Sequence, residues 1–218
     1  MSNALVFGAT GSTGCFFIDH IKSANDWKDI FIVVRQKRPE WAELANDPRF
    51  HFLETPHIMD KQAIFNDLLK GAKVDAVFNF LGGHVSDGEG SFRNTDLNFV
   101  IASARIAEEL GAKQFHTISA EGADSKSMFL YWRVKGECLE ELKKIQLPIV
   151  YVYKPGVIQE RKDATLGEKI FGLVPFIHKL KCTDLANAVL KNASKAATQA
   201  GDLPNGYHEF TNNEILEL

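Results

Sequence analysis

Cysteine is scarce in this chain. There are three, Cys15, Cys138 and Cys182, and they form no Cys-x-x-Cys pair. Disulfide-stapled secreted domains and closely spaced zinc sites depend on such pairs, so the sequence argues against both. The seven histidines show no metal-ligand spacing either. We therefore expect no metal, and we predict a reduced, cytoplasmic setting.

Long apolar runs and strong net charge are also lacking. No run approaches the roughly 20 apolar residues that cross a bilayer, and the first ten residues already read as strand and turn rather than as a signal peptide. The net charge of −3 gives no bulk attraction to nucleic acid or to an anionic membrane surface. We expect neither nucleic acid nor membrane as a partner. With 218 residues, 45% of them hydrophobic, the chain fits one domain.

Three glycines near the start of the chain mark the first candidate binding site in the sequence. The segment 6–14 reads Val-Phe-Gly-Ala-Thr-Gly-Ser-Thr-Gly, between an apolar run and a helix-like spacing of bulky residues. Strand, glycine turn and helix in this order form the dinucleotide-binding unit. Gly8 permits the tight turn, Gly11 lets a pyrophosphate approach the backbone, and Gly14 lets helix and strand pack closely. The alternative is a tight turn without a ligand.

Apolar runs and helical spacings alternate along the rest of the chain. Strands are expected at 5–7, 30–34, 50–53, 75–81, 115–118, 148–153 and 207–210, and helices at 15–21, 61–70, 95–110, 129–145 and 184–194. This alternation predicts an α/β fold, a Rossmann-type doubly wound parallel sheet, with ligands at the carboxyl ends of the strands. We predict one domain over 1–218, in which 157–181 and 200–218 form a small cap on the substrate side. An apolar stretch within 157–181 suggests a cover for the substrate cleft.

A basic segment follows the second predicted strand. A dinucleotide site that prefers NAD usually has Asp or Glu there for the ribose 2′-hydroxyl. Here Arg35, Lys37 and Arg38 stand instead, and they suit a 2′-phosphate. The sequence therefore predicts NADP(H), with Arg35 as the contact. A basic loop that is merely solvated is the alternative.

Tyr131 and Lys135 form a Tyr-x-x-x-Lys pair on one face of a predicted helix. Ser119 stands 12 residues earlier, at the expected end of a strand. The glycine turn, this Ser…Tyr-x-x-x-Lys pattern and the Pro155-Gly156 turn together resemble the short-chain dehydrogenase/reductase superfamily in its extended and atypical branches. The segments 115–124, 129–137 and 154–157 look like its TIP30-like group, and the resemblance covers almost the whole chain.

The resemblance implies an atypical short-chain fold that binds NADPH. It gives Lys135 the nicotinamide ribose, Tyr131 the proton that goes to a carbonyl oxygen, and Ser119 a hydrogen bond to that oxygen. Asp96 departs from the pattern, because many relatives carry Asn there in a proton relay. The expected catalytic residues are Ser119, Tyr131 and Lys135. The expected cofactor-binding residues are Gly8, Thr10, Gly11, Ser12, Thr13, Gly14, Arg35, Leu81, Gly82, Tyr131, Lys135, Pro155, Gly156 and Val157.

Two kinds of function remain open from the sequence. The first is an NADP-dependent oxidoreductase that reduces a small carbonyl or quinone-like compound. The second is an NADP(H)-binding regulatory or redox-sensing protein without robust turnover. An epimerase is disfavoured, because such relatives usually need about 80–100 further residues. We expect a small-molecule substrate, and the sequence leaves a homodimer or a protein partner open.

Overall fold

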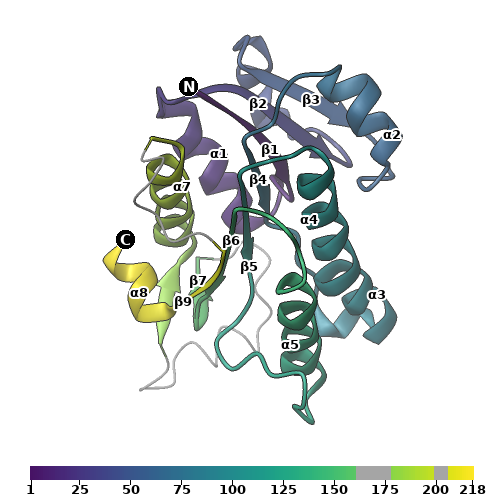
Figure 1. The fold of residues 1–218 in the computed structure, drawn as a ribbon, viewed down its shortest axis with the longest axis vertical. Helices are drawn as coiled ribbons and strands as arrows, with labels where there is room; N and C mark the ends of the chain where they lie inside the picture. Colours follow the sequence, from purple (N-terminus) through teal and green to yellow (C-terminus); the bar gives the residue numbers. More distant parts are fainter. Residues whose placement is uncertain (161–177, 199–205) are drawn as a thin grey trace.

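The computed structural model describes residues 1–160, 178–198 and 206–218 (Figure 1). Its centre is a parallel sheet of seven strands in the order β3-β2-β1-β4-β5-β6-β9. The strands are β1 (Ser2–Phe7), β2 (Trp27–Val34), β3 (Phe50–Glu54), β4 (Ala76–Asn79), β5 (Gln114–Ile118), β6 (Ile149–Lys154) and β9 (Gly206–Thr211). The order 3-2-1-4-5-6 is that of the Rossmann fold, so the predicted fold class is confirmed.

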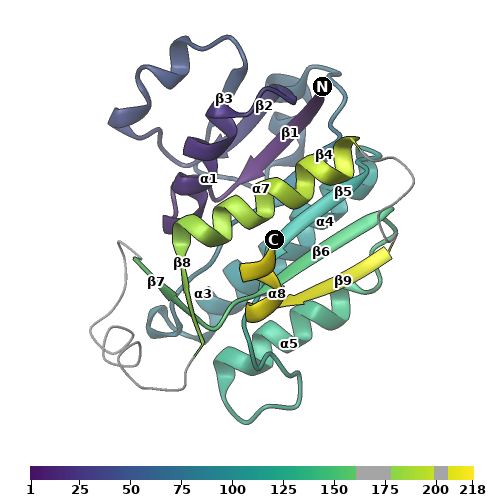
Figure 2. The ribbon, with the colours of Figure 1, turned by 90° about the vertical axis from the view of Figure 1, so that its left-hand side faces the viewer.

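Helices cover both faces of this sheet, and each face has its own apolar core (Figures 1 and 2). Helices α1 (Ser12–Ser23) and α7 (Cys182–Thr198) pack on one face, and α4 (Phe99–Glu109) and α5 (Leu130–Leu142) pack on the other. In β1, Ala4 and Val6 face the first core, whereas Leu5 and Phe7 face the second. Because both faces are buried, β1 over Ala4–Phe7 and β2 over Ile30–Val34 are continuously apolar rather than alternating.

Short elements complete the described chain. Those before β5 are η1 (Pro39–Trp41), η2 (Leu44–Asn46), α2 (Lys61–Ala63), η3 (Ile64–Leu69), η4 (Val85–Asp87), α3 (Glu89–Arg93) and η5 (Asn94–Asn98). A second sheet pairs β7 (Val157–Gln159) with β8 (Lys179–Lys181), and helix α8 (Asn212–Glu217) ends the chain. The expected helices over 61–70 and 95–110 thus each combine an α-helical and a π-helical stretch.

The C-terminal segment differs from the expected appendage. Residues 206–211 form β9, which pairs in parallel with β6 along its length and makes that edge of the main sheet. The sequence predicts a short strand at 207–210 after a stretch without a clear pattern, and this does not indicate which strand it pairs with. Helix α7 begins at Cys182, two residues before the expected start at 184, so Thr183 lies inside the helix. The apolar stretch that was expected to cover the cleft lies within 161–177, outside the described residues.

Candidate functional site

The glycine turn joins β1 to α1, and two of its glycines are required by close packing. Gly8 has a φ of +74°, and a Cβ there would lie 2.5 Å from the backbone N of Leu81 at the end of β4. A Cβ at Gly14 would lie 2.2 Å from the carbonyl oxygen of Gly8. Side chains at these two positions would therefore collide with backbone, whatever the site binds.

Gly11 has a different environment. Its φ of −71° suits any residue, and the nearest atom to a Cβ there would be the Gly8 oxygen at 3.4 Å. Packing therefore does not require glycine at this position, and its small size leaves space above the start of α1. Gly11 is also the N-cap of α1, and because glycine has no side chain, the helix start is not capped by one.

The start of α1 is suited to an anion. The first N–H groups of a helix have no acceptor within the helix, and the helix dipole favours negative charge there. No acidic residue stands in the first turn of α1 to compete with such a ligand. The space above Gly11 and this helix start together fit the pyrophosphate of a dinucleotide.

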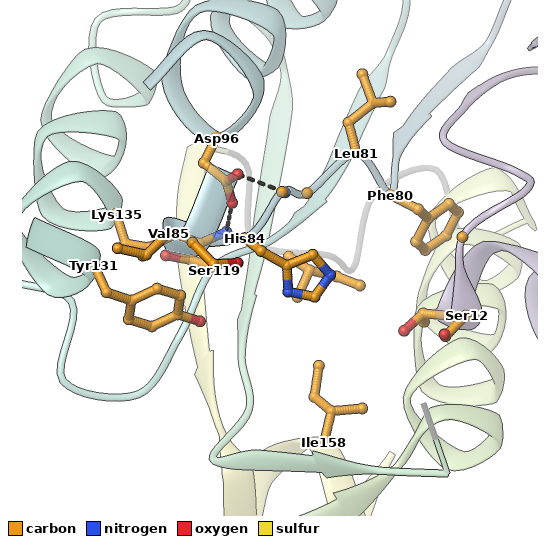
Figure 3. A pocket seen from close by; sticks show the side chains of 16 residues that line it. Ser12, Phe80, Leu81, His84, Val85, Asp96, Ser119, Tyr131, Lys135 and Ile158 are labelled. Atoms are coloured by element: carbon orange, nitrogen blue, oxygen red, sulfur yellow. Dashed lines mark hydrogen bonds and ion pairs between the residues drawn. The ribbon is translucent and has the colours of Figure 1, made fainter. Parts of the chain in front are cut away.

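A pocket of about 380 Å³ opens between this turn and α5 (Figure 3). Ser12 lies on one side of it, and Tyr131, Lys135 and Asp96 lie on the other. The lining residues are Gly11, Ser12, Thr13, Phe80, Leu81, Gly82, Gly83, His84, Val85, Ser86, Asp96, Ile118, Ser119, Tyr131, Lys135 and Ile158. The expected catalytic residues thus share one pocket with the glycine turn.

Ser119 follows β5 directly, and Tyr131 and Lys135 lie one turn apart on α5. The Ser119 side chain is buried, and its Oγ has no hydrogen-bond partner within the described part of the chain. A buried hydroxyl without a partner costs about 1–3 kcal/mol, so this atom suits a ligand that supplies one. The Tyr131 ring stacks on Phe92, with centroids 5.7 Å apart, and remains 38% exposed.

Lys135 is buried and makes an ion pair with Asp96. Its Nζ lies 2.7 Å from Asp96 Oδ1, and the other carboxylate oxygen, Oδ2, accepts the backbone N–H of Gly83 at 2.7 Å. Burial opposes the charge on Lys135, but the carboxylate of Asp96 outweighs it and raises the pKa of Lys135 above its ordinary value. Asp96, where the sequence departs from the family pattern, is therefore a direct ion-pair partner of Lys135, the candidate catalytic lysine.

The loop before α5 explains why the residue after Lys135, Gly136, is a glycine. A Cβ at Gly136 would lie 2.1 Å from the backbone N of Ser125, so this loop crosses α5 where the helix has no side chain. The backbone N–H of Asp124 donates to the carbonyl oxygen of Trp132, which fixes the crossing. The segment between Ser119 and Tyr131 is thereby held against the helix that carries Tyr131 and Lys135.

The basic segment after β2 presents its cations differently from the expectation. Arg35 is exposed and lies outside the pocket lining. Arg38 instead reaches the glycine turn, where its Nη2 donates to the carbonyl oxygen of Thr10 at 2.8 Å, and it also pairs with Glu40. The Lys37 ammonium lies over the Phe52 ring, 5.3 Å from its centroid. Arg38 is the cation that this structure holds beside the turn.

The Pro155–Val157 turn makes close contacts with other parts of the chain. The backbone N–H of Gly156 donates to Asn212 Oδ1 at 3.0 Å, and a Cβ at Gly156 would lie 2.3 Å from the carbonyl oxygen of His178. Val157 pairs in the small sheet, and the next residue, Ile158, lines the pocket instead. The Thr13 side chain likewise turns toward Cys182, with 3.7 Å between Oγ1 and Sγ.

Sequence reasoning did not select the apolar lining residues Phe80, Val85, Ile118 and Ile158. Gly83 and Ser86 also line the pocket, and Gly83 had a signal, because it adjoins Gly82 at a strand end. The apolar members had none, since a pocket-facing Ile or Phe looks like a core residue in sequence. His84, which follows the strand-end glycines, also faces this pocket (Figure 3).

His116 lies in β5 and is a structural histidine. Nδ1 lies 3.1 Å from the Tyr153 hydroxyl and Nε2 lies 2.8 Å from Gln114 Oε1, both inside the core. Burial lowers the pKa of His116 to about 3, so the ring is neutral at ordinary pH. Across the described residues, no cluster of His, Cys, Asp or Glu is arranged to hold a metal, and no helix is long and apolar enough to cross a membrane.

The sheet order and the glycine turn together define a Rossmann-type fold. Among solved structures, DesIV, a dTDP-glucose 4,6-dehydratase from Streptomyces venezuelae with NAD bound, has a TM-score of 0.71 at 13% identity, over 97% of this chain and 76% of that one. ElxO with NADPH bound has a TM-score of 0.69 at 16% identity, over 99% of both chains. At these identities the likeness shows the fold.

Relatives in sequence narrow this class. Protein FMP52, mitochondrial, of Lodderomyces elongisporus is 28% identical over 236 aligned residues, which cover 100% of this chain and 97% of that protein. HTATIP2 (TIP30) of Rattus norvegicus is 28% identical over 183 residues, covering 80% of this chain and 73% of that protein. No protein-family model matches the chain. These homologues and the structural neighbours are consistent with an atypical short-chain dehydrogenase/reductase of the TIP30 group, as the sequence motifs predicted.

The expected cytoplasmic location is wrong by this comparison. FMP52 proteins from Lodderomyces elongisporus, Scheffersomyces stipitis and Aspergillus niger are all described as mitochondrial. These names point to the mitochondrion rather than to the cytoplasm. Scarce cysteine indicates a reducing environment, but it does not distinguish one reducing compartment from another.

Proposed function

We propose that this protein is an NADPH-dependent reductase of a small carbonyl or quinone-like compound, and that it works in mitochondria as its FMP52 relatives are described. The observation that carries the proposal is the convergence of Ser119, Tyr131 and Lys135 on one pocket that also contains the glycine turn. The Ser119 hydroxyl has no hydrogen-bond partner among the described residues, and this supports the proposal because a substrate carbonyl or hydroxyl would supply the missing hydrogen bond.

We assign the adenosine phosphate to the basic segment and the pyrophosphate to the start of α1. Arg38 supports the choice of NADP(H), since its guanidinium is already fixed beside Thr10 in the turn. Arg35 remains a candidate contact from the exposed side of the same segment. The nicotinamide end then extends toward Leu81, Gly82 and Lys135 on the far side of the pocket.

A bound NADPH would supply a hydride to the carbonyl carbon. Tyr131 donates its phenolic proton to the carbonyl oxygen, and Ser119 donates a hydrogen bond to the same oxygen. Lys135 holds the nicotinamide ribose and is itself held by Asp96. The partial exposure of Tyr131 gives a substrate access to its hydroxyl.

The test is a panel of aldehydes, ketones and quinones, with NADPH oxidation followed by absorbance at about 340 nm. The matched control is Tyr131→Phe, which keeps the ring on Phe92 and removes one oxygen. Turnover that falls by roughly 10²–10⁴-fold in this variant supports the reductase. Turnover that is unchanged in the variant would contradict it.

An NADP(H)-binding regulator without robust turnover is the second candidate. It is favoured by the Asp96–Lys135 ion pair, because one hydrogen of the Lys135 ammonium is already engaged within the protein. Tight NADPH binding in calorimetry, together with no NADPH oxidation by any member of the panel, would select this function. Absence of binding would contradict both candidates.

A further inference from the structure

The charges inside the pocket are balanced. Among the described lining residues, Lys135 is the one Lys or Arg and Asp96 is the one Asp or Glu. Both are almost fully buried, at 7% and 2% exposure, and they touch each other at 2.7 Å. The far side of the pocket, opposite Ser12, therefore holds one positive and one negative charge rather than a lysine alone (Figure 3).

The carboxylate of Asp96 is fixed in this place by more than Lys135. Its second oxygen accepts the Gly83 N–H at 2.7 Å. Two further groups face the pair from α5, the Tyr131 phenol and the Cys138 thiol, and burial raises the pKa of the thiol to about 12. His84 faces the pocket from the loop after β4.

This balance bears on the oxidation state of the cofactor. The nicotinamide ring of NADP⁺ carries a positive charge, and that of NADPH carries none. In a poorly hydrated pocket, a lysine without a counter-charge repels a cationic ring and has little effect on a neutral one. A carboxylate at contact distance from that lysine offsets most of this repulsion, and so removes most of the difference in affinity between the cationic and the neutral ring.

We propose that Asp96 sets the relative affinity of this site for NADP⁺ and NADPH by neutralising Lys135 at the nicotinamide end. The proposal rests on the proposed function insofar as a dinucleotide must bind with that end near Lys135. It requires no turnover, so it applies equally to a reductase and to a redox-sensing protein. Asp96 is thus a positioning residue that acts through Lys135.

The experiment measures the dissociation constants of NADP⁺ and NADPH by calorimetry for four proteins: wild type, Asp96→Asn, Lys135→Met and the double variant. Both substitutions preserve size and remove one charge. Each titration is repeated at about pH 6 and about pH 8, because a buried charge without a partner tends to neutralise. Glu209→Gln is the matched control, since it removes the charge of an ion-paired carboxylate, held by Lys154, outside the pocket lining.

We expect the ratio Kd(NADP⁺)/Kd(NADPH) to rise about tenfold in Asp96→Asn and to fall in Lys135→Met. The double variant should return near the wild-type ratio, and Glu209→Gln should leave it unchanged. Any loss of ribose binding in Lys135→Met affects both cofactors and cancels in the ratio.

The proposal is overturned if the wild type binds both cofactors but the two single variants shift the ratio in the same direction, or not at all. If Asp96→Asn does not fold by circular dichroism, Lys135→Met alone decides, because its ratio must fall. If the wild type binds neither cofactor, this proposal and the proposed function fail together, which distinguishes that outcome from the first.

Discussion

Replacing Arg38 by alanine tests how the site recognises the adenosine end of the cofactor. The Arg38 guanidinium donates to Thr10 O at 2.8 Å and pairs with Glu40, and its side chain is 25% exposed. It is therefore positioned at the turn before any ligand arrives. A lost hydrogen bond to a charged group is worth about 1.5–3 kcal/mol. At 1.4 kcal/mol per tenfold, NADPH affinity should fall by roughly 10- to 100-fold.

NADH separates recognition of the phosphate from support of the turn. NADH lacks the 2′-phosphate, so its affinity should change little in Arg38→Ala. Arg35→Ala is the comparison variant, because it removes an exposed cation of the same segment that is the other candidate for the phosphate. Titration of both cofactors against all three proteins decides the matter. Equal losses for NADPH and NADH in Arg38→Ala would refute phosphate recognition and leave Arg38 as a brace for Thr10.

Three further outcomes follow from the geometry. Gly11→Ala should keep the melting temperature and weaken dinucleotide binding in calorimetry. Gly14→Ala should instead lower stability by about 1–3 kcal/mol, since its Cβ meets Gly8 O at 2.2 Å. A Gly11→Ala protein that loses stability but keeps its dinucleotide affinity would exclude a ligand above Gly11. Tyr131→Phe should bind NADPH as the wild type does while turnover falls, as fluorescence and absorbance assays would show. For His116, whose folded pKa of about 3 lies below the unfolded value of about 6.5, the unfolded state binds the extra proton below pH 6.5. Its contribution to stability is therefore lost as the pH falls, by about 1.6 kcal/mol between pH 6.5 and pH 5, and urea unfolding of His116→Gln should lack that part of the slope.

Much of the fold was predictable because its signals are local. A run such as 30–34 needs no knowledge of its neighbours to be a buried strand, and β2 contains it. The pairing of β9 with β6 was not predictable, because a lone strand after a weakly patterned stretch could extend the sheet or leave it. The start of α7 at Cys182 was missed for a similar reason, since Thr183 suits an N-cap in any local reading.

The candidate site divides in the same way. Ser119, Tyr131 and Lys135 lie in the same pocket because a strand end and one helix face are fixed by spacing alone. The partner of Lys135 was not predictable from spacing, because Asp96 comes from η5, 39 positions earlier in the chain, and meets Lys135 only through tertiary packing. The choice between Arg35 and Arg38 depended on side-chain direction in a loop, which no periodicity encodes.

The glycine turn shows which part of a motif carries information about a ligand. Gly8 and Gly14 would be needed by this backbone even if nothing bound, because a Cβ at either position meets backbone atoms within 2.5 Å. Their presence therefore indicates a tight strand–helix turn and no more. Gly11 has ordinary backbone angles and no close neighbour, so its fold places no demand on it. A residue that the fold does not require, at a helix start whose first amides have no acceptor within the helix, is the one that points to a phosphate.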